Sequence, residues 1–138
     1  MVMMALPAQY PKDTDGFPPP IPGQVNCKFG TVTYQTPSGT PLFFLPNLAE
    51  IVGWEFTVNA AFNAGTTNTL DVGVSGAQTQ FAAALALTAI NTVIVNGFVG
   101  TQMFSRLPGI TTVTVRYNQT GTAASAGSGV LSCWYIVR

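Results

Sequence analysis

Few residues in this chain could carry chemistry, and their types and spacing restrict what that chemistry could be. The 138 residues include no histidine and only five Asp and Glu residues. Glu50 and Glu55 are the closest acids in the folded part, and glycoside hydrolysis requires two carboxylates that converge across a cleft. Because they stand five positions apart on one predicted strand, their side chains should point to opposite faces unless Gly53 allows a bulge. The spacing therefore argues against a glycosidase.

Other catalytic and cofactor-binding patterns are also missing from the sequence. No nucleophile stands with a base to activate it, and the lack of histidine excludes a zinc site with a histidine ligand. Residues 121–129 resemble a phosphate loop in composition only, because they lack the Lys-Ser/Thr ending and precede a strand. Asp71 stands between Leu70 and Val72 on the expected outer face of a strand, where a hydrogen-bonding role is expected. We expect neither an enzyme nor a bound cofactor or metal ion.

The charge content favours a component of an assembly. Five Lys and Arg residues balance five Asp and Glu residues, so no basic surplus is available to neutralise phosphates, and we predict no nucleic acid partner. Only 7% of the residues are charged, whereas a typical soluble domain has about 25%. A surface this poor in charge suits a chain that other chains cover, with Thr and Asn hydrating the remainder.

A membrane helix is an alternative interpretation of the uncharged stretch between Asp71 and Arg106. Its most apolar part, residues 81–95, is shorter than the about 20 residues that a membrane helix needs. Residues 93–95 are β-branched and are followed by Asn96-Gly97, which predicts a hairpin over residues 93–99. Residues 1–8 lack the basic start of a secretory signal. We therefore predict no membrane partner.

Residues 1–24 differ from the rest of the chain and are predicted to form an extended Pro-rich arm. They contain six of the ten prolines, and each proline fixes its own backbone and keeps the preceding residue out of the helical region. An arm without periodicity becomes ordered only by lying on something else. We predict that it contacts a neighbouring chain through Tyr10, Phe17, Pro19 and Ile21. The alternative is that it folds back along its own domain.

Residues 25–138 are predicted to form a single all-β domain, an antiparallel β-sandwich or jelly roll. Short segments with a period of two alternate with turn residues about every 10–15 positions. These segments are residues 28–35, 54–60, 70–74, 93–99, 112–117 and 129–138, with a proline-bounded edge strand at 41–46. Residues 78–87 could instead form a helix, because Ala and Leu favour helices, or an irregular crossover.

The last predicted strand is apolar on both faces. Leu131, Cys133 and Tyr135 lie on one face, and Val130, Trp134 and Ile136 lie on the other. A strand covered on both sides is central in a sheet or lies at a subunit contact, and we predict partner contacts through Leu131 and Tyr135. Cys27 and Cys133 could form one disulfide, but two small buried side chains are the preferred interpretation.

Two segments in the C-terminal half resemble small virion proteins of tailed bacteriophages. Residues 69–76, T-L-D-V-G-V-S-G, followed by Phe81, are similar to their (I/L)-D-V-G-T-S-G…F/Y segment. Residues 122–136 are similar to their T-A-G-x-(A/G)-x-V-x-V-x-Y ending, with Tyr135 in the place of that tyrosine, and residues 113–115 match the strand before it. Val74 stands where Thr is commoner, and residues 77–80 replace the usual acidic residues.

The resemblance implies a head decoration, or cement, protein: a β-sandwich, often trimeric, that binds over joints between capsid subunits and has no catalytic residues. We therefore expect a structural virion protein on the outer surface of a phage capsid, assembled in the host cytoplasm. Its expected partners are the major capsid protein and further copies of itself in a homotrimer, where symmetry repeats each weak contact. The alternatives are a tail, collar or fibre-anchoring protein, and a carbohydrate-binding sandwich that uses Trp54 or Trp134 as a stacking platform.

Overall fold

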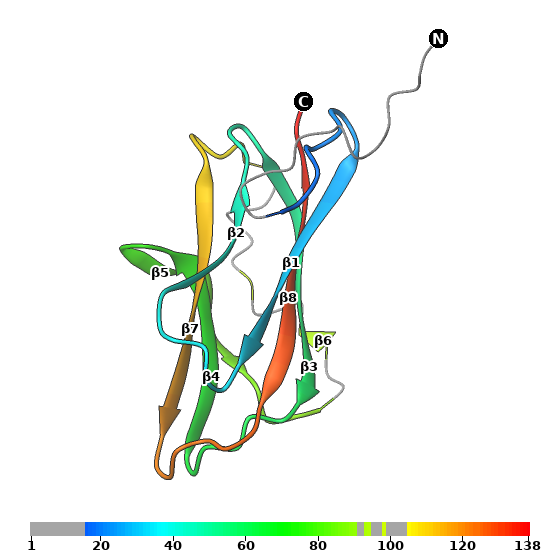
Figure 1. Ribbon diagram of the computed structural model, residues 1–138. Helices are drawn as coiled ribbons and strands as arrows, with labels where there is room; N and C mark the ends of the chain where they lie inside the picture. Colours follow the sequence, from blue (N-terminus) through cyan, green and yellow to red (C-terminus); the bar gives the residue numbers. More distant parts are fainter. Residues whose placement is uncertain (1–15, 91–92, 95–97, 99–104) are drawn as a thin grey trace.

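The described part of the chain is built from β-strands arranged in two layers (Figure 1). The computed structural model describes residues 16–90, 93–94, 98 and 105–138, and within them no helix occurs. Sheet A contains four strands in the order β1 (Val25–Thr33), β8 (Ser128–Ile136), β3 (Glu50–Ala60) and β6 (Val93–Ile94). Sheet B contains four in the order β2 (Thr40–Leu45), β7 (Thr111–Thr120), β4 (Thr67–Val74) and β5 (Ala77–Ala86). The predicted antiparallel β-sandwich is confirmed.

The strands pair in a nested order along the chain. β1 pairs with β8, β2 with β7, β3 with β6, and β4 with β5, each time antiparallel. Two further pairs, β3 with β8 and β4 with β7, complete the sheets. The start of β1 therefore lies beside the end of β8, where Val25 is opposite Ile136.

The core lies between the sheets and, where the strands are regular, is formed by every second side chain, as a period of two requires. Trp54, Phe56 and Val58 of β3 are 4%, 0% and 0% exposed, which confirms the alternation predicted for this strand. Trp54 stacks on Phe98 from the chain segment that follows β6, with 5.4 Å between ring centroids and an interplanar angle of 2°. Burial of each such aromatic side chain contributes about 1.5–3 kcal/mol to the free energy of unfolding.

The predicted edge strand is confirmed, whereas the helical interpretation of residues 78–87 is wrong. β2 lies at the edge of sheet B and contains Pro41, which has no N–H to donate to a further strand. Residues 77–86 form β5 on β4, with Phe81 and Leu85 buried. Pairing with β4 outweighs the local preference of Ala and Leu for helix, because that preference is worth only on the order of 0.5 kcal/mol per residue.

The hairpin predicted over residues 93–99 lies mostly outside the described residues, which include only Val93, Ile94 and Phe98 of this segment. Val93 and Ile94 pair with β3 of sheet A, whereas Phe98 bridges to Ala82 in sheet B. The described residues on the two sides of Asn96-Gly97, which itself lies outside the described residues, thus belong to different sheets. Over the described residues, the structure has no helix long and apolar enough to span a bilayer.

Candidate functional site

The described end of the Pro-rich arm lies along the domain to which it belongs. The Phe17 ring stands edge-on to Phe29 of β1, with 5.3 Å between centroids and an interplanar angle of 90°. The Lys28 Nζ lies 5.6 Å from the centroid of the same ring, and the Gly23 N–H donates to the Val137 carbonyl at 2.7 Å. Residues 16–24 therefore follow the alternative in which the arm folds back, and Phe17 is placed on its own domain.

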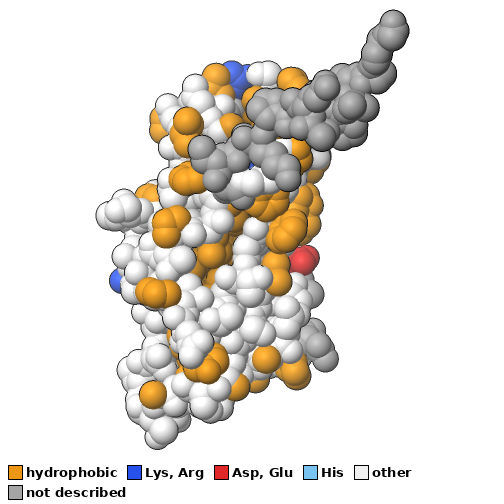
Figure 2. Space-filling view, in the orientation of Figure 1, with side chains coloured by type: hydrophobic (Ala, Val, Ile, Leu, Met, Phe, Trp, Pro, Cys, Tyr) orange, Lys and Arg blue, Asp and Glu red, His pale blue; other side chains and the backbone are white. Residues whose placement is uncertain are grey.

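The arm and β1 enclose a hollow of about 320 Å³. Four of the six predicted contact residues line it together: Phe17, Pro19, Ile21 and Tyr135. Three large apolar side chains are exposed here, Ile21 (55%) and Val25 (57%) in the lining and Phe29 (55%) further along β1, and we call these three the arm patch. Figure 2 shows hydrophobic side chains along β1 and very few charged atoms on this face. Tyr10, the remaining arm residue predicted as a contact, lies outside the described residues.

The contact prediction for Leu131 and Tyr135 requires correction. Both side chains belong to the inward face of β8 and are 0% and 1% exposed, so they stabilise the core of their own chain. Tyr135 reaches the hollow beneath the arm, whereas Leu131 does not line it. The outward face of the same strand carries Val130, Trp134 and Ile136, each half-buried. Because β8 is apolar on both faces, its sequence pattern does not show which face is the inner one.

Of the two tryptophans, only Trp134 lies on an outer surface. Trp54 is part of the core. The Trp134 ring lies beside the backbone of Gly53 in β3, because a Cβ added at Gly53 would be 3.8 Å from Trp134 Cε3. We call Val130, Trp134 and Ile136 the sheet A patch; it flanks the arm patch, since β1 and β8 are neighbours.

Glu50 and Glu55 lie on the same face of sheet A, contrary to the expectation from their spacing. The register between β3 and β8 shifts between Ile51 and Gly53, so that Val52 is an extra residue in β3. A bulge of this kind reverses the alternation of side chains beyond it. Both glutamates consequently face outward, where each is half-buried.

The two glutamates nevertheless remain apart. Glu50 lies opposite Ile136 and Glu55 lies opposite Ser132, two residues of β8 that are four positions apart. Four positions correspond to about 13 Å along a strand, whereas the paired carboxylates of glycosidases lie about 5–9.5 Å apart. Glu50 instead accepts hydrogen bonds from Arg138 Nε at 3.2 Å and Arg106 Nε at 3.3 Å. The hydrogen bond from Arg138, and after it that from Arg106, holds the pKa of Glu50 below its ordinary value.

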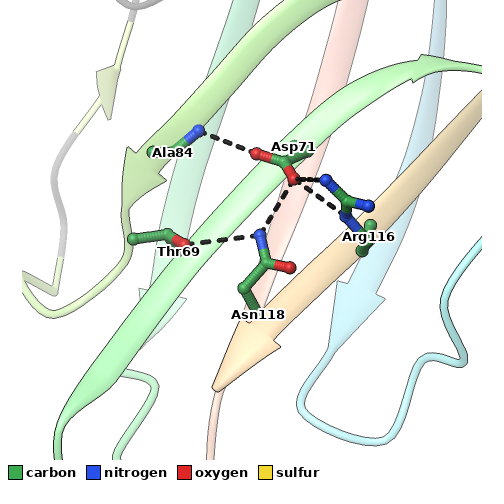
Figure 3. A network of polar contacts seen from close by, with 5 residues as sticks. All are labelled: Thr69, Asp71, Ala84, Arg116 and Asn118. Carbon is green, nitrogen blue, oxygen red and sulfur yellow. Dashed lines mark hydrogen bonds and ion pairs between the residues drawn. The ribbon is translucent and has the colours of Figure 1, made fainter. Parts of the chain in front are cut away.

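Asp71 is the centre of a buried polar network on the outer side of sheet B (Figure 3). It is 4% exposed. Its Oδ2 accepts hydrogen bonds from Arg116 Nε (2.9 Å) and Nη2 (2.6 Å) and from Asn118 Nδ2 (3.0 Å), all from β7. Its Oδ1 accepts the backbone N–H of Ala84 in β5 at 2.8 Å. The carboxylate thus ties three adjacent strands together, which is the hydrogen-bonding role predicted for it.

The charge state of Asp71 follows from this arrangement. Burial by itself raises the pKa of this carboxyl, but the hydrogen bonds from Asn118, the Ala84 N–H and Arg116 outweigh it, so the pKa lies below its ordinary value. The carboxylate is therefore ionised at neutral pH, and all of its described partners are donors. Such a group has a structural role, because its oxygens are already occupied.

A one-residue bulge in β5, where Leu70 and Val72 are opposite Leu85 and Ala82, predicts a stabilising substitution at Ala84. Ala84 has a φ of 55°, a left-handed conformation that costs a residue with a Cβ about 1 kcal/mol or more. We expect Ala84→Gly to raise the free energy of unfolding by up to about 1 kcal/mol in urea denaturation. Ala86→Gly in the same strand is the control and should lower it by about 0.5–1 kcal/mol. Equal losses in both variants would contradict the strain assigned to Ala84.

The two cysteines are free thiols on opposite faces of sheet A. Cys27 pairs with Trp134 and Cys133 pairs with Lys28, so the cysteines are offset by one residue on adjacent strands. Cys133 is buried, and burial raises the pKa of its thiol well above the ordinary value. The prediction of a buried side chain is confirmed for Cys133 and wrong for Cys27, which is exposed.

One charged side chain lies inside the domain without having been predicted there. Lys28 is 1% exposed, and its Nζ donates to the Phe44 carbonyl of β2 at 2.6 Å, a contact between the two sheets. The period of two predicted for residues 28–35 places Lys28 on the same face as Val32, which is the inner face of β1. Within the described ranges, no group of three or more Cys, Asp or Glu side chains is arranged to hold a metal ion.

The comparisons with known proteins concern the fold. No protein-family model matches the sequence, and no curated protein matches it either. A chain in the cyanophage Pam1 capsid asymmetric unit is similar over 96% of this chain and 100% of its own length, with a TM-score of 0.59 and 20% identity. A chain in the capsid of Ralstonia phage GP4 is similar over 87% of this chain and 88% of its own length, with a TM-score of 0.61 and 21% identity. This chain therefore shares its fold with chains of two phage capsids.

Proposed function

We propose that this protein is a structural component of a phage particle that binds the outer surface of the capsid as a homotrimer and stabilises contacts between capsid subunits. The proposed partners are the major capsid protein and further copies of this chain; nucleic acid, membranes and catalysis have no part in the role. The proposal is supported chiefly by the fold, which extends over the whole of a chain in one phage capsid structure and most of a chain in another.

The strand pairing supports the same role. The nested order, first with eighth, second with seventh, third with sixth and fourth with fifth, is consistent with an eight-stranded jelly roll, an architecture that viral capsid domains use. Such a sandwich pairs its first strand with its last, which makes a stiff unit. A cement needs stiffness because it transmits force between the subunits that it joins.

The distribution of charge suits repeated protein contacts. Of the ten charged residues, Lys28 and Asp71 are buried, and Glu50 is bound to two arginines. Contacts over such a surface remove few charges from water. They therefore avoid most of the desolvation cost, which is several kcal/mol for each buried ion. Weak neutral contacts that symmetry repeats around a trimer and over a shell sum to strong attachment.

Two patches are proposed as the contact surface, the arm patch and the sheet A patch. They adjoin each other on β1 and β8 and combine exposed and half-buried apolar side chains, including two aromatic rings, and interface cores are rich in aromatic residues and poor in charge. The position of Trp134 gives the carbohydrate-binding alternative its one supporting observation, since a half-buried outer tryptophan can stack on a sugar ring. A tail or collar position is the other alternative, and cryo-EM of particles that contain the protein separates it from the capsid surface.

Fluorescence quenching of Trp134 tests the proposed contact surface. In Trp54→Phe the remaining Trp134 is expected to be quenched by acrylamide in the unbound protein and to become protected when empty capsid shells are added. In the control Trp134→Phe, the core residue Trp54 should be shielded in both states, because it is 4% exposed. Light scattering should give three times the chain mass of 14.5 kDa.

Two outcomes would contradict the proposal. One is a monomer that shells neither bind nor protect at Trp134. The other is protection of Trp134 by soluble oligosaccharides and not by shells, which would favour the carbohydrate-binding module.

A further inference from the structure

The hairpin between β4 and β5 folds over the outer face of sheet B. Val72 pairs with Ala82 and Val74 with Ala77, so two steps along β4 match five steps along β5. The extra residues of β5 stand out from the sheet, as Figure 1 shows. The hairpin rests on Gly73, where an added Cβ would overlap the Ala77 carbonyl oxygen.

A hollow of about 420 Å³ lies between this hairpin and Arg116. Its lining consists of Gly76, Ala77, Gln78, Thr79 and Arg116. Arg116 donates to Asp71 through Nε and Nη2, while Nη1 has no acceptor among the described residues. The Arg116 side chain is 38% exposed, so a cationic donor is available at the hollow.

Gln78 supplies a second unmet hydrogen-bonding group. Its Oε1 is buried and has no donor in the part of the chain that the structure describes. Its Nε2 lies near Gly39, 3.9 Å from the position that a Cβ would take there. Because no hydrogen bond within the described ranges holds the amide, rotation of the side chain can present Oε1 to a group bound in the hollow. Native proteins rarely leave such an acceptor unpaired.

We propose that this hollow binds the backbone of an extended segment of the capsid shell protein. A carbonyl of that segment accepts from Arg116 Nη1, and an N–H donates to Gln78 Oε1. The inference rests on the proposed function for the source of the segment. It adds a second contact, on sheet B, to the patches on sheet A.

The chemistry of the two groups selects a peptide. Arg116 Nη1 needs an acceptor and Gln78 Oε1 needs a donor, and a peptide unit carries both. A carboxylate has acceptors only and would leave Gln78 Oε1 without a donor. Among the described residues, no aromatic ring lines the hollow, so a sugar lacks a stacking surface there. The described part of the Pro-rich arm suits the hollow poorly, because residues 18–20 are prolines without N–H groups.

The substitution Gln78→Leu tests this inference with two readouts. In the unbound protein, removal of the unpaired carbonyl is expected to raise the melting temperature by about 3 °C. For empty capsid shells assembled without this protein, the affinity measured by cosedimentation is expected to fall about tenfold, because the partner loses a hydrogen bond at a desolvated site. A gain of stability together with a loss of binding distinguishes a contact residue from a structural one.

Gln80→Leu is the matched control, since Gln80 belongs to the same hairpin but lines a different hollow, with Val74 and Ile110. It should leave the affinity within about twofold of wild type. A lower melting temperature for Gln78→Leu, unchanged binding, or an equal loss in Gln80→Leu would overturn the inference and leave the proposed function in place. Failure of the wild-type protein itself to bind shells would overturn the proposed function and this inference together.

Discussion

The variant Asp71→Ala is expected to have a free energy of unfolding about 3 kcal/mol lower than that of the wild-type protein. The substitution removes the acceptor for donors from Arg116, Asn118 and the Ala84 backbone, at a site where the carboxylate is 4% exposed. Because the Arg116 side chain is 38% exposed, water can solvate part of its charge, which keeps the loss at the lower end of the range for broken buried pairs. Urea denaturation at pH 7 measures the difference.

Two variants serve as controls for Asp71→Ala. Glu55→Ala removes an outward-facing acid of sheet A that accepts a hydrogen bond from Thr57 Oγ1 at 3.3 Å, and it should cost less than about 1 kcal/mol. The double variant Asp71→Leu with Arg116→Met removes both charges and should recover part of the loss, because no charged group is left unpaired. A loss below about 1 kcal/mol in Asp71→Ala would show that the network does not hold the strands together.

The same carboxylate gives stability a dependence on pH with a definite sign. The pKa of Asp71 is lower in the folded protein than its ordinary value of 3.8, so the unfolded chain binds the proton more readily. The stabilisation is complete well above that ordinary value and is lost as the pH falls through it and through the lower pKa of the folded state. Asp71→Asn, measured in urea at pH 7 and at steps down to pH 2, should therefore show a smaller loss on acidification than the wild-type protein.

The sandwich could be predicted because burial imposes a period of two on each strand. In β3 the alternation of Trp54, Phe56 and Val58 with polar residues survives in the structure without exception. The prolines around residues 41–46 likewise indicate an edge strand, since a proline has no N–H to donate to a neighbouring strand. Local pattern and tertiary structure agree wherever the strand is regular.

The positions of the bulges could not be predicted, although Gly53 indicates that one is possible, and two of the errors arise from them. A single extra residue at Val52 brings Glu50 and Glu55 to the same face, and the longer slip in β5 separates residues 78–87 from a simple alternation. Such register shifts depend on contacts between strands distant in sequence. The sequence predicts contacts for Phe17, Pro19 and Ile21, which line one hollow, but because β8 is apolar on both faces it does not show that Leu131 faces the core.

Residues 69–76, the segment that resembles small phage virion proteins, determine the shape of the hairpin between β4 and β5. Asp71 binds the N–H of the left-handed residue Ala84, which lies in the one-residue bulge where Leu70 and Val72 are opposite Leu85 and Ala82. Gly73 gives the hairpin backbone room to lie on β4, and Gly76 has a φ of 83°, which suits the turn between the strands. The motif therefore specifies how β5 leaves the sheet. It thereby shapes the hollow beside Arg116.

Gly73→Ala is the second substitution with a large expected effect, a loss of about 3 kcal/mol in the free energy of unfolding. The added methyl would overlap the Ala77 carbonyl oxygen and would lie 2.5 Å and 2.7 Å from the carbonyl carbon and oxygen of Gln78. These atoms belong to backbone, so relief requires the hairpin to move off β4. Such a movement weakens the pairing of β5 and exposes apolar surface near Val72.

Gly53→Ala is the matched control, because a methyl there would meet Trp134 Cε3 at 3.8 Å, an ordinary contact distance. Its free energy of unfolding should stay within about 0.5 kcal/mol of wild type. If the hairpin shifts without unfolding the domain, Gly73→Ala should also bind shells more weakly than the wild-type protein, because the hollow between Gln78 and Arg116 changes shape. Equal stability of the two variants would mean that the hairpin moves at no cost, and a hairpin that moves at no cost could not hold a preformed binding site.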